Sequence, residues 1–562
     1  MQDPREAPFR LVDATFRQAC SRGARALWRS GPEQVGVWIL ALIIGTAAGF
    51  AALIFRRGID WLQTTVYGTE DVLQLHSFAA TLEWYWILVI PMLGGTAVGI
   101  VLYLWTPDGR VRSVADVIEG AALREGRVER KAGVASAVAS WITLSTGGSS
   151  GREGPVVHLA AMISSWIADL FKADAIRGRD LLGCAVAAAV SASFNAPIAG
   201  ALFALEVVLR HFALHALAPI VVASAAGTVI NRLAFGDVTE FVLPGTTALE
   251  FYVELPAFLI LGLVCGVVAA VMMRSIFWAD DVESQLQKRL GLPDWVRPAL
   301  AGALLGAIAI FFPHIIGVGY ETTSSALTGQ LPLREALIFA IVKVVAVAIT
   351  IGGRMGGGVF SPSLMVGALT GLTFGLIATG LFPDVSGGHT LYALAGMGAV
   401  AAAVLGAPIS TTLIVFELTG DWQTGLAVML SVSISTSVSA QLVTRSFFLT
   451  QLARKRVHLA AGPQAYLLGM FRVAAVMRKL EAGSAEEERC WELVRKGVYI
   501  DGNATLDTAL KQFEEAGVSV LPVVPLTDGD DAPPELLGAL FHVDSLKVYN
   551  RALAAAAAEE HS

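Results

Sequence analysis

Two glycine-rich loops interrupt the apolar runs of this chain at corresponding places, and this pattern restricts the fold more than any other feature. The first loop begins at Gly147 and ends at Pro155, and the second begins at Gly352 and ends at Pro362. Several neighbouring apolar segments are shorter than the roughly 20 residues that a helix needs to cross a bilayer. Irregular backbone at membrane depth is tolerated only where it is buried in protein or lines a cavity. The pattern therefore predicts a membrane protein with broken helices.

Composition supports this class and argues against others. Of the 562 residues, 55% are hydrophobic and only 15% are charged, whereas a soluble chain has about 25% charged residues. The net charge of −7, without a long basic tract, does not indicate a nucleic-acid partner. The four cysteines fit no metal or disulfide framework. The apolar segments also contain no pairing of a nucleophile with a base, so we expect neither a metal site nor an enzyme.

The chain also contains an internal repeat. The alanine-rich sequence at 185–190 recurs at 399–404, and each copy is followed by Ala-Pro-Ile and then by a glutamate, Glu206 or Glu417. Because the glycine-rich loops recur in the same order, we infer a duplication, and inverted duplications are common in transporters. We expect both glutamates to cap helices or to pair structurally.

The sequence divides into three predicted domains. Residues 1–34 are polar and rich in arginine, which predicts a cytoplasmic amphipathic segment. Residues 35–457 form the expected transmembrane domain, with halves at about 35–235 and 250–443. Residues 459–562 are more charged and alternate between helix and strand patterns, which predicts a small α/β domain outside the membrane.

Each glycine-rich loop is followed by the pattern of a helix N-terminus, which is a candidate anion cradle. The first helical turn has N–H groups without partners and a partial positive charge, and glycine lets an anion approach the backbone. Glu153 stands beside the first cradle, where its carboxylate would compete with an anion and would respond to protonation. The alternative is an ordinary capping carboxylate. The second cradle, around Val359 and Phe360, favours a gate.

Three motifs carry a resemblance to a known family. Gly151-Arg152-Glu153-Gly154-Pro155, Gly358-Val359-Phe360-Ser361-Pro362, and Asn195-Ala196-Pro197 with Glu206 resemble the chloride channel (CLC) family of anion channels and proton-coupled anion exchangers. The resemblance covers residues 35–457. It implies an all-α polytopic membrane protein with an inverted repeat of tilted, broken helices. It also implies a homodimer in the inner (plasma) membrane of a bacterium, with both termini cytoplasmic, which transports chloride or a related small anion.

The resemblance assigns roles to individual residues. Glu153 would be the gate, and its carboxylate would occupy an anion position until it is protonated or displaced. Backbone N–H groups would bind the anion at Gly151, Arg152, Val359 and Phe360.

The chain departs from the family pattern where the anion-binding serine loop should fall. Residues 111–115 replace the family's Gly-Ser-Gly-Ile-Pro sequence, and without a gap Arg112 takes the place of the serine. A shift of one residue would restore Ser113 as the anion ligand. Arg112 would then either add a cation at the inner anion entrance or be a solvated arginine. We favour the solvated arginine because a buried unpaired charge is costly.

Two further departures bear on the transport mode. Phe448 aligns with the family's inner tyrosine, which keeps the ring and loses the hydroxyl, although Phe448 could instead pack in the dimer core. Val207 stands where many exchangers have a proton-relay glutamate. Val207 slightly favours a channel-like mode over the alternative, chloride/proton antiport, and an unrelated membrane transporter is less favoured. His158 is a candidate proton carrier, but we favour a packing role. The preferred anion stays open.

The C-terminal region resembles a CBS domain. Residues 505–553 resemble one full unit, with strands expected at 518–524 and 536–541, and residues 471–477 resemble its entry strand. The resemblance would imply an adenine nucleotide as ligand, and a module that binds nothing is the alternative. We expect no other cofactor.

Overall fold

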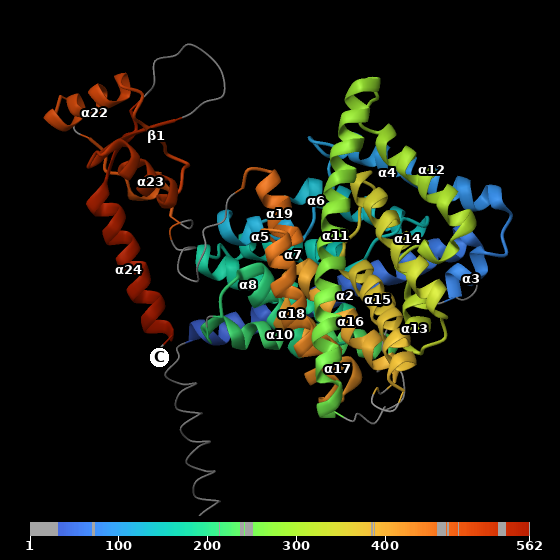
Figure 1. The fold of residues 1–562 in the computed structure, drawn as a ribbon. Coiled ribbons are helices and arrows are strands. Elements are labelled where there is room, and N and C mark those ends of the chain that lie inside the picture. The colour runs from blue at the N-terminus through green and yellow to red at the C-terminus, as the bar shows by residue number, and fades with distance from the viewer. Residues whose placement is uncertain are drawn as a thin grey trace, which may run out of the picture.

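The computed structural model describes residues 32–560 apart from 70–73, 213, 237–240, 242–250, 384–385, 387, 458–467, 469–470, 481–482 and 526–535. The predicted amphipathic segment therefore lies outside the described residues up to residue 31. The described chain forms a large helical domain and a small C-terminal unit with both helices and strands (Figure 1).

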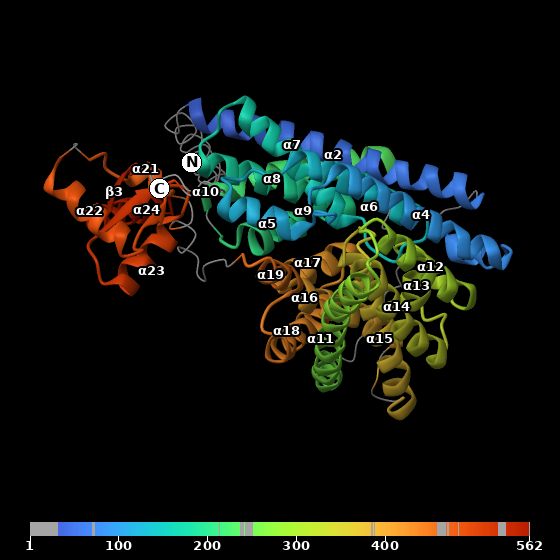
Figure 2. The same ribbon diagram turned by 90° about the horizontal axis from the view of Figure 1, so that it is seen from above.

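The helical domain consists of two sets of helices that lie side by side (Figure 2). The first set contains α2 (Pro32–Tyr67), α3 (Leu75–Ala79), α4 (Trp84–Trp105), α5 (Val114–Leu123), α6 (Arg130–Ser145), α7 (Glu153–Leu170), α8 (Ala175–Phe194), α9 (Pro197–Phe203), the π-helix η2 (Ala204–Leu209) and α10 (Leu214–Phe235). The second set contains α11 (Phe251–Leu290), α12 (Val296–Phe311), η3 (Pro313–Ile315), α13 (Tyr320–Leu327), α14 (Leu333–Gly352), α15 (Phe360–Leu381), α16 (His389–Leu405), α17 (Pro408–Thr419), α18 (Trp422–Leu442) and α19 (Phe447–Arg454).

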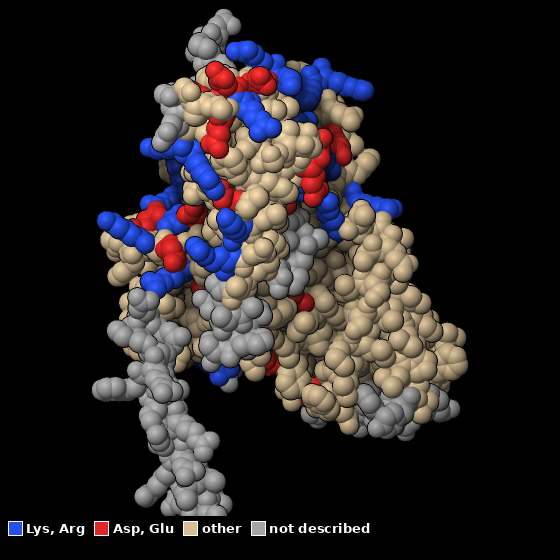
Figure 3. Space-filling view, turned by 90° about the vertical axis from the view of Figure 1, so that its left-hand side faces the viewer, with Lys and Arg blue, Asp and Glu red and all other residues tan. Residues whose placement is uncertain are grey.

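Helix length and surface composition agree with a membrane location. Among the described residues, seven helices are long and apolar enough to cross a bilayer, and shorter apolar helices such as α12, α16 and α17 lie between them. Many large apolar side chains are exposed, for example Trp61 and Leu233. Figure 3 shows charged side chains gathered toward the top of the face in view and a broad uncharged area below them. Such a large exposed apolar surface is stable only in contact with lipid or protein.

Each of the two glutamates of the repeat caps a helix in the other half of the domain. The Glu417 carboxylate accepts hydrogen bonds from the backbone N–H groups of Ile198 (3.0 Å) and Ala199 (2.8 Å) at the start of α9. The Glu206 carboxylate accepts those of Ile409 (2.9 Å) and Ser410 (2.8 Å) at the start of α17. Each carboxylate satisfies N–H groups that a helix start leaves without partners. The predicted structural role of both glutamates is confirmed.

Replacing one of these caps should destabilise the helical domain. In Glu206→Ala, the N–H groups of Ile409 and Ser410 lose a charged acceptor in a largely apolar setting, which should cost about 1–3 kcal/mol. Thermal unfolding in detergent measures the change. Glu83→Ala is the matched control, because Glu83 precedes α4 and makes no capping hydrogen bond with its side chain. Equal melting temperatures for the two variants would contradict the capping role.

The C-terminal unit is a three-stranded sheet with helices. Its strands are β1 (Ile500–Asp501), β2 (Val520–Val524) and β3 (Gly538–Phe541), and its helices are α21 (Val473–Val476), α22 (Ala485–Arg495), α23 (Leu506–Ala516) and α24 (His542–Glu560). The central strand β2 pairs with β1 in parallel and with β3 antiparallel. Leu506, Phe513, Leu521 and Leu540 are among the residues of its core. The strands expected at 518–524 and 536–541 are confirmed, with ends shifted by up to two residues.

The strand expected at 471–477 is wrong. The middle of this segment is the helical turn α21, and isolated bridges at Arg472 and Arg478 lie on either side of it. The backbone N–H groups of Val473 and Ala474 donate to the carbonyls of Ala504 and Gly502, which lie in the turn after β1. The apolar side chains therefore reach the core from a turn, and periodicity alone does not distinguish this from a short strand.

Candidate functional site

The two glycine-rich loops meet in the centre of the helical domain. Gly151 and Gly358 exchange backbone hydrogen bonds in both directions, each with an N···O distance of 2.7 Å. Helix α7 starts two residues after Gly151, and α15 starts two residues after Gly358. The bridge therefore holds two helix N-termini, one from each half, next to each other. Their unpaired N–H groups make this place favourable for negative charge.

The Glu153 carboxylate occupies this place. Glu153 is only 2% exposed. One of its oxygens accepts a hydrogen bond from the hydroxyl of Ser361, and the other lies 3.4 Å from the backbone nitrogen of Ser361. Ser361 is the second residue of α15, so the carboxylate reaches across to the helix start of the other half. A small anion would be stabilised by the same N–H groups and the same helix dipole.

A narrow cavity of about 30 Å³ adjoins the carboxylate. The structure brings five of the predicted site residues to its wall: Glu153, Val359, Phe360, Phe448 and Ser113. Gly151 contributes through its bridge to Gly358, which lines the cavity. The Arg152 side chain is directed elsewhere, with its guanidinium carbon 5.2 Å from the centre of the Tyr320 ring. The predicted role of Arg152 rests on its backbone alone.

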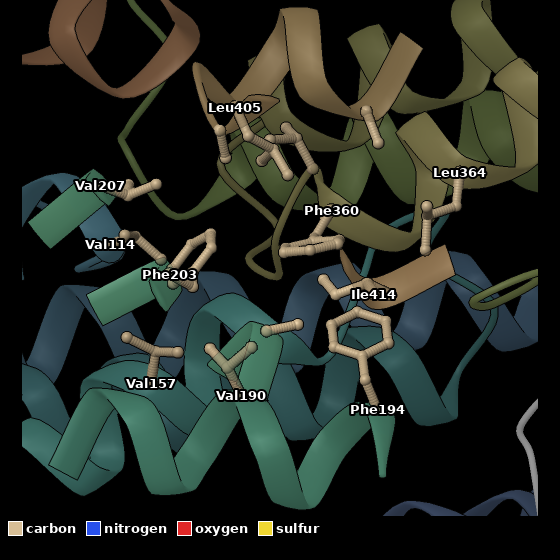
Figure 4. Packing of buried hydrophobic residues seen from close by; sticks show 14 of the residues in the cluster. Val114, Val157, Val190, Phe194, Phe203, Val207, Phe360, Leu364, Leu405 and Ile414 are labelled. Carbon is tan, nitrogen blue, oxygen red and sulfur yellow. The ribbon is translucent and has the colours of Figure 1, made fainter. Parts of the chain in front are cut away.

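Apolar side chains form the remaining walls. Phe360 packs between Phe194 and Phe203, with ring centroids 4.6 and 5.7 Å apart (Figure 4). Val207 lies on the π-helix η2 and is 6% exposed. Figure 4 shows Val207 close to Val114, within the same apolar cluster. Val207 is thus an apolar side chain in an apolar environment.

Ser113 lies at the cavity wall because it caps α5. Its hydroxyl accepts a hydrogen bond from the backbone N–H of Ala115 at 3.3 Å, and its own backbone N–H donates to Asp116 at 2.8 Å. Burial would raise the pKa of Asp116, but the nearby Lys455 ammonium, at 2.6 Å, lowers it below its usual value. This capping box directs the N-terminus of α5 toward the cavity, so a third helix start contributes to the site.

Arg112 points away from the narrow cavity. Its guanidinium pairs with Asp108 at 2.8 Å and with Glu129 at 3.0 Å. These three residues line a separate wide cavity of about 640 Å³. Burial would lower the pKa of Arg112, but the hydrogen bond and charge of Asp108 raise it above its usual value. The structure therefore fits neither expectation for Arg112: its guanidinium does not reach the narrow cavity, and the side chain is 11% exposed and ion-paired rather than solvated. Ser113, and not Arg112, lines the narrow cavity.

A second cavity of about 130 Å³, here called the basic cavity, adjoins the narrow one. Both cavities are lined by Ser113, Ile351, Gly357 and Gln451. The charged residues described in the wall of the basic cavity are four cations and one acid, namely Arg110, Arg354, Arg454, Lys455 and Asp280. A cleft lined mainly by positive charge concentrates anions near its mouth. The narrow cavity is therefore reached from a compartment that favours anions.

Sequence reasoning missed Gln451, which is a polar side chain shared by the two cavities. A signal for it was present in the chain. Gln451 follows Phe448 by three residues on α19, and residues at this spacing lie on one face of a helix. The docking of α19 against α5, which brings that face to Ser113, is a tertiary contact that the sequence pattern does not contain.

Comparisons with known proteins agree with this architecture. The model of the family described as voltage gated chloride channel matches residues 94–440. A ClcB-like chloride channel protein of Ralstonia nicotianae is 30% identical over 424 residues, which covers 74% of this chain and 96% of that protein. The voltage-gated ClC-type chloride channel ClcB of Escherichia coli O17:K52:H18 is 28% identical over 423 residues. This match covers 74% of this chain and 98% of that protein.

The fold comparison gives the same result. The crystal structure of a slow cyanobacterial Cl⁻/H⁺ antiporter superimposes with a TM-score of 0.66 at 21% identity, and the match covers 75% of this chain and 97% of that chain. At this sequence identity, the structural similarity supports a shared fold and carries no information on the transport mode. From its sequence match and its fold, the chain belongs to the voltage-gated chloride channel (CLC) family of multi-pass membrane proteins that transport anions.

Proposed function

We propose that the protein moves chloride or a related small anion through the narrow cavity, and that Glu153 is the protonatable gate. The observation that carries the proposal is the contact of the Glu153 carboxylate with Ser361 at the start of α15. While it is charged, the carboxylate fills the place that offers an anion the best stabilisation. Protonation removes its charge and weakens its hold on the helix start, so that an anion can displace it.

We further propose that transport is channel-like. Val207 has no titratable group and lies among apolar side chains, so this residue cannot pass a proton to the gate. Glu153 would then exchange protons by another route and act as a pH-sensitive gate that does not drive antiport.

A proton-flux assay tests the transport mode. In liposomes with a chloride gradient and a potassium shunt, we expect chloride efflux without proton movement in fixed proportion. A pH electrode and a chloride electrode in the same chamber measure both fluxes. Proton uptake in constant ratio to chloride would overturn the channel-like mode. A Val207→Ala variant is the matched control and should leave the proton trace unchanged.

One observation favours chloride/proton antiport as the second candidate. His158 lies on α7, is 2% exposed and lines the wide cavity together with Asp116 and Glu129. Neither ring nitrogen has a hydrogen-bond partner within the described part of the chain. His158 would then carry the proton that Val207 cannot. Under antiport, His158→Asn should abolish proton uptake and retain chloride flux, whereas a packing histidine predicts no change in the ratio of the two fluxes.

We propose a homodimer in the inner membrane of a bacterium, with both termini in the cytoplasm. Exposed apolar residues on α9 and α17, such as Ile198 and Ile409, support a protein interface on these short helices. Mass measurement in detergent tests the dimer.

For the C-terminal unit, which has one sheet of three strands, we propose a CBS-like module. Calorimetry of the full protein with ATP or AMP tests whether this module binds an adenine nucleotide.

A further inference from the structure

We propose that the side-chain amide of Gln451 is an anion ligand at the junction between the basic cavity and the narrow cavity, and that it sets anion selectivity. The ligand class is a small monovalent anion such as chloride, bromide or nitrate. This inference rests on the proposed transport function and deepens it.

Gln451 lies where the two cavities meet. Four residues line both cavities, namely Ser113, Ile351, Gly357 and Gln451. Ile351 has an apolar side chain and Gly357 has none, so Ser113 and Gln451 are the two polar side chains among these four. An anion that moves from the basic cavity toward Glu153 passes between them.

The hydrogen bonds at the junction leave the amide nitrogen of Gln451 without a protein partner among the described residues. The Ser113 hydroxyl accepts from Ala115 and donates to Oε1 of Gln451 at 3.1 Å, which is nearer than the other acceptor within its reach, Oδ2 of Asp116 at 3.4 Å. This bond orients the amide, because Oε1 faces Ser113 and Nε2 is left with two N–H groups. Within the described part of the chain, Nε2 donates to no protein acceptor. A donor that lines a cavity and has no protein partner is available to an anion.

The neighbours of Gln451 on α19 that line the narrow cavity are aromatic. Phe447 and Phe448 are buried at the start of this helix and line the narrow cavity, but neither ring can donate a hydrogen bond. The amide is thus the donor that the side chains of α19 offer at this wall. It is neutral, so it can stabilise an anion without holding it as tightly as a cation would, which suits an ion that must leave again.

The nearby charges do not substitute for the amide. Lys455, which lines the basic cavity, is paired with Asp116 at 2.6 Å, and Arg454 is paired with Asp281. Both pairs reduce the attraction of these cations for a passing anion. Arg110 and Arg354, the other two cations of the basic cavity, do not line the narrow cavity. Hydrogen bonds from the amide are therefore the interaction at the junction that can distinguish anions by size and by hydration.

Gln451→Leu tests the proposal, because leucine keeps much of the volume and removes both donors. Isothermal titration of the full-length protein in detergent with chloride should show a dissociation constant raised about tenfold, the loss expected for one hydrogen bond to a charged group. In liposomes, the flux ratios of bromide and nitrate to chloride should change as well. Gln451→Glu should weaken binding further, because its carboxylate repels the anion.

Thr450→Ala is the matched control, since Thr450 lies on the same helix and bonds to the carbonyl of Arg445 without lining either cavity. Thermal unfolding of all variants shows whether they are folded. Unchanged chloride affinity and unchanged flux ratios in a folded Gln451→Leu protein would overturn the role of the amide and leave the proposed function intact. Absence of chloride binding and flux in the unaltered protein would overturn both.

Discussion

Chloride flux through Glu153→Ala is expected to exceed that of the unaltered protein at neutral pH and to lose its dependence on pH. The substitution removes a buried carboxylate whose hydrogen bonds to Ser361 hold it at the start of α15. A hydrogen bond of a charged group contributes about 1.5–3 kcal/mol, so its loss corresponds to a roughly 10- to 100-fold change if displacement of the carboxylate limits the flux. Chloride efflux from liposomes between pH 4 and pH 8 measures both effects.

The sign of the pH dependence follows from the charge of Glu153, the proposed gate. In the unaltered protein, acidification protonates Glu153 and weakens its hold on the helix start, so flux should rise as the pH falls. Glu153→Gln keeps the shape without the charge and should give a high and flat profile. Glu335→Ala is the matched control, because Glu335 lies in the first turn of α14 and is exposed. A Glu153→Gln protein with the pH profile of the unaltered protein would show that another group is the gate.

The local parts of this site were predictable from the sequence. Glycine followed by an early helical proline marks a helix start wherever the chain is placed, and the structure begins α7 at Glu153 and α15 at Phe360 as the pattern implies. The repeat predicted that Glu206 and Glu417 have equivalent roles, and each caps the helix of the other half. The helix starts depend on short stretches of chain, and the equivalence of the two glutamates follows from the repeat, whereas their capping partners lie 204 and 218 residues away.

The tertiary parts were not predictable in the same way. The partner of Glu153 is Ser361, which is 208 residues away in sequence, and the partner of Ser113 is Gln451, which is 338 residues away. Such contacts depend on how whole helices pack, and neither residue type signals its partner. The same limit explains why the strand expected at 471–477 is a helical turn. The apolar pattern correctly predicted that side chains of this segment are buried, but the conformation depends on the hydrogen-bond partners of the backbone.

Gly357→Ala is expected to unfold the centre of the site and to abolish anion flux. Gly357 has a φ of +101°, a conformation that side-chain-bearing residues rarely adopt. A Cβ atom at this position would lie 2.1 Å from Oγ of Ser150 and 2.5 Å from its Cβ. Strained backbone alone costs about 1–3 kcal/mol, and relief of the clash would separate the two glycine-rich loops. Because Gly357 lines both cavities, this displacement would move the cradle.

Thermal unfolding in detergent and chloride flux in liposomes measure the two consequences, and both should fall together. Gly380→Ala is the matched control, because Gly380 lies in α15 and a Cβ atom there meets nothing within 4 Å. Alanine is favoured over glycine in a helix by up to about 1 kcal/mol, so this variant should be at least as stable as the unaltered protein. A stable and active Gly357→Ala protein would mean that the loops tolerate separation, and the anion path would then not depend on the bridge between Gly151 and Gly358.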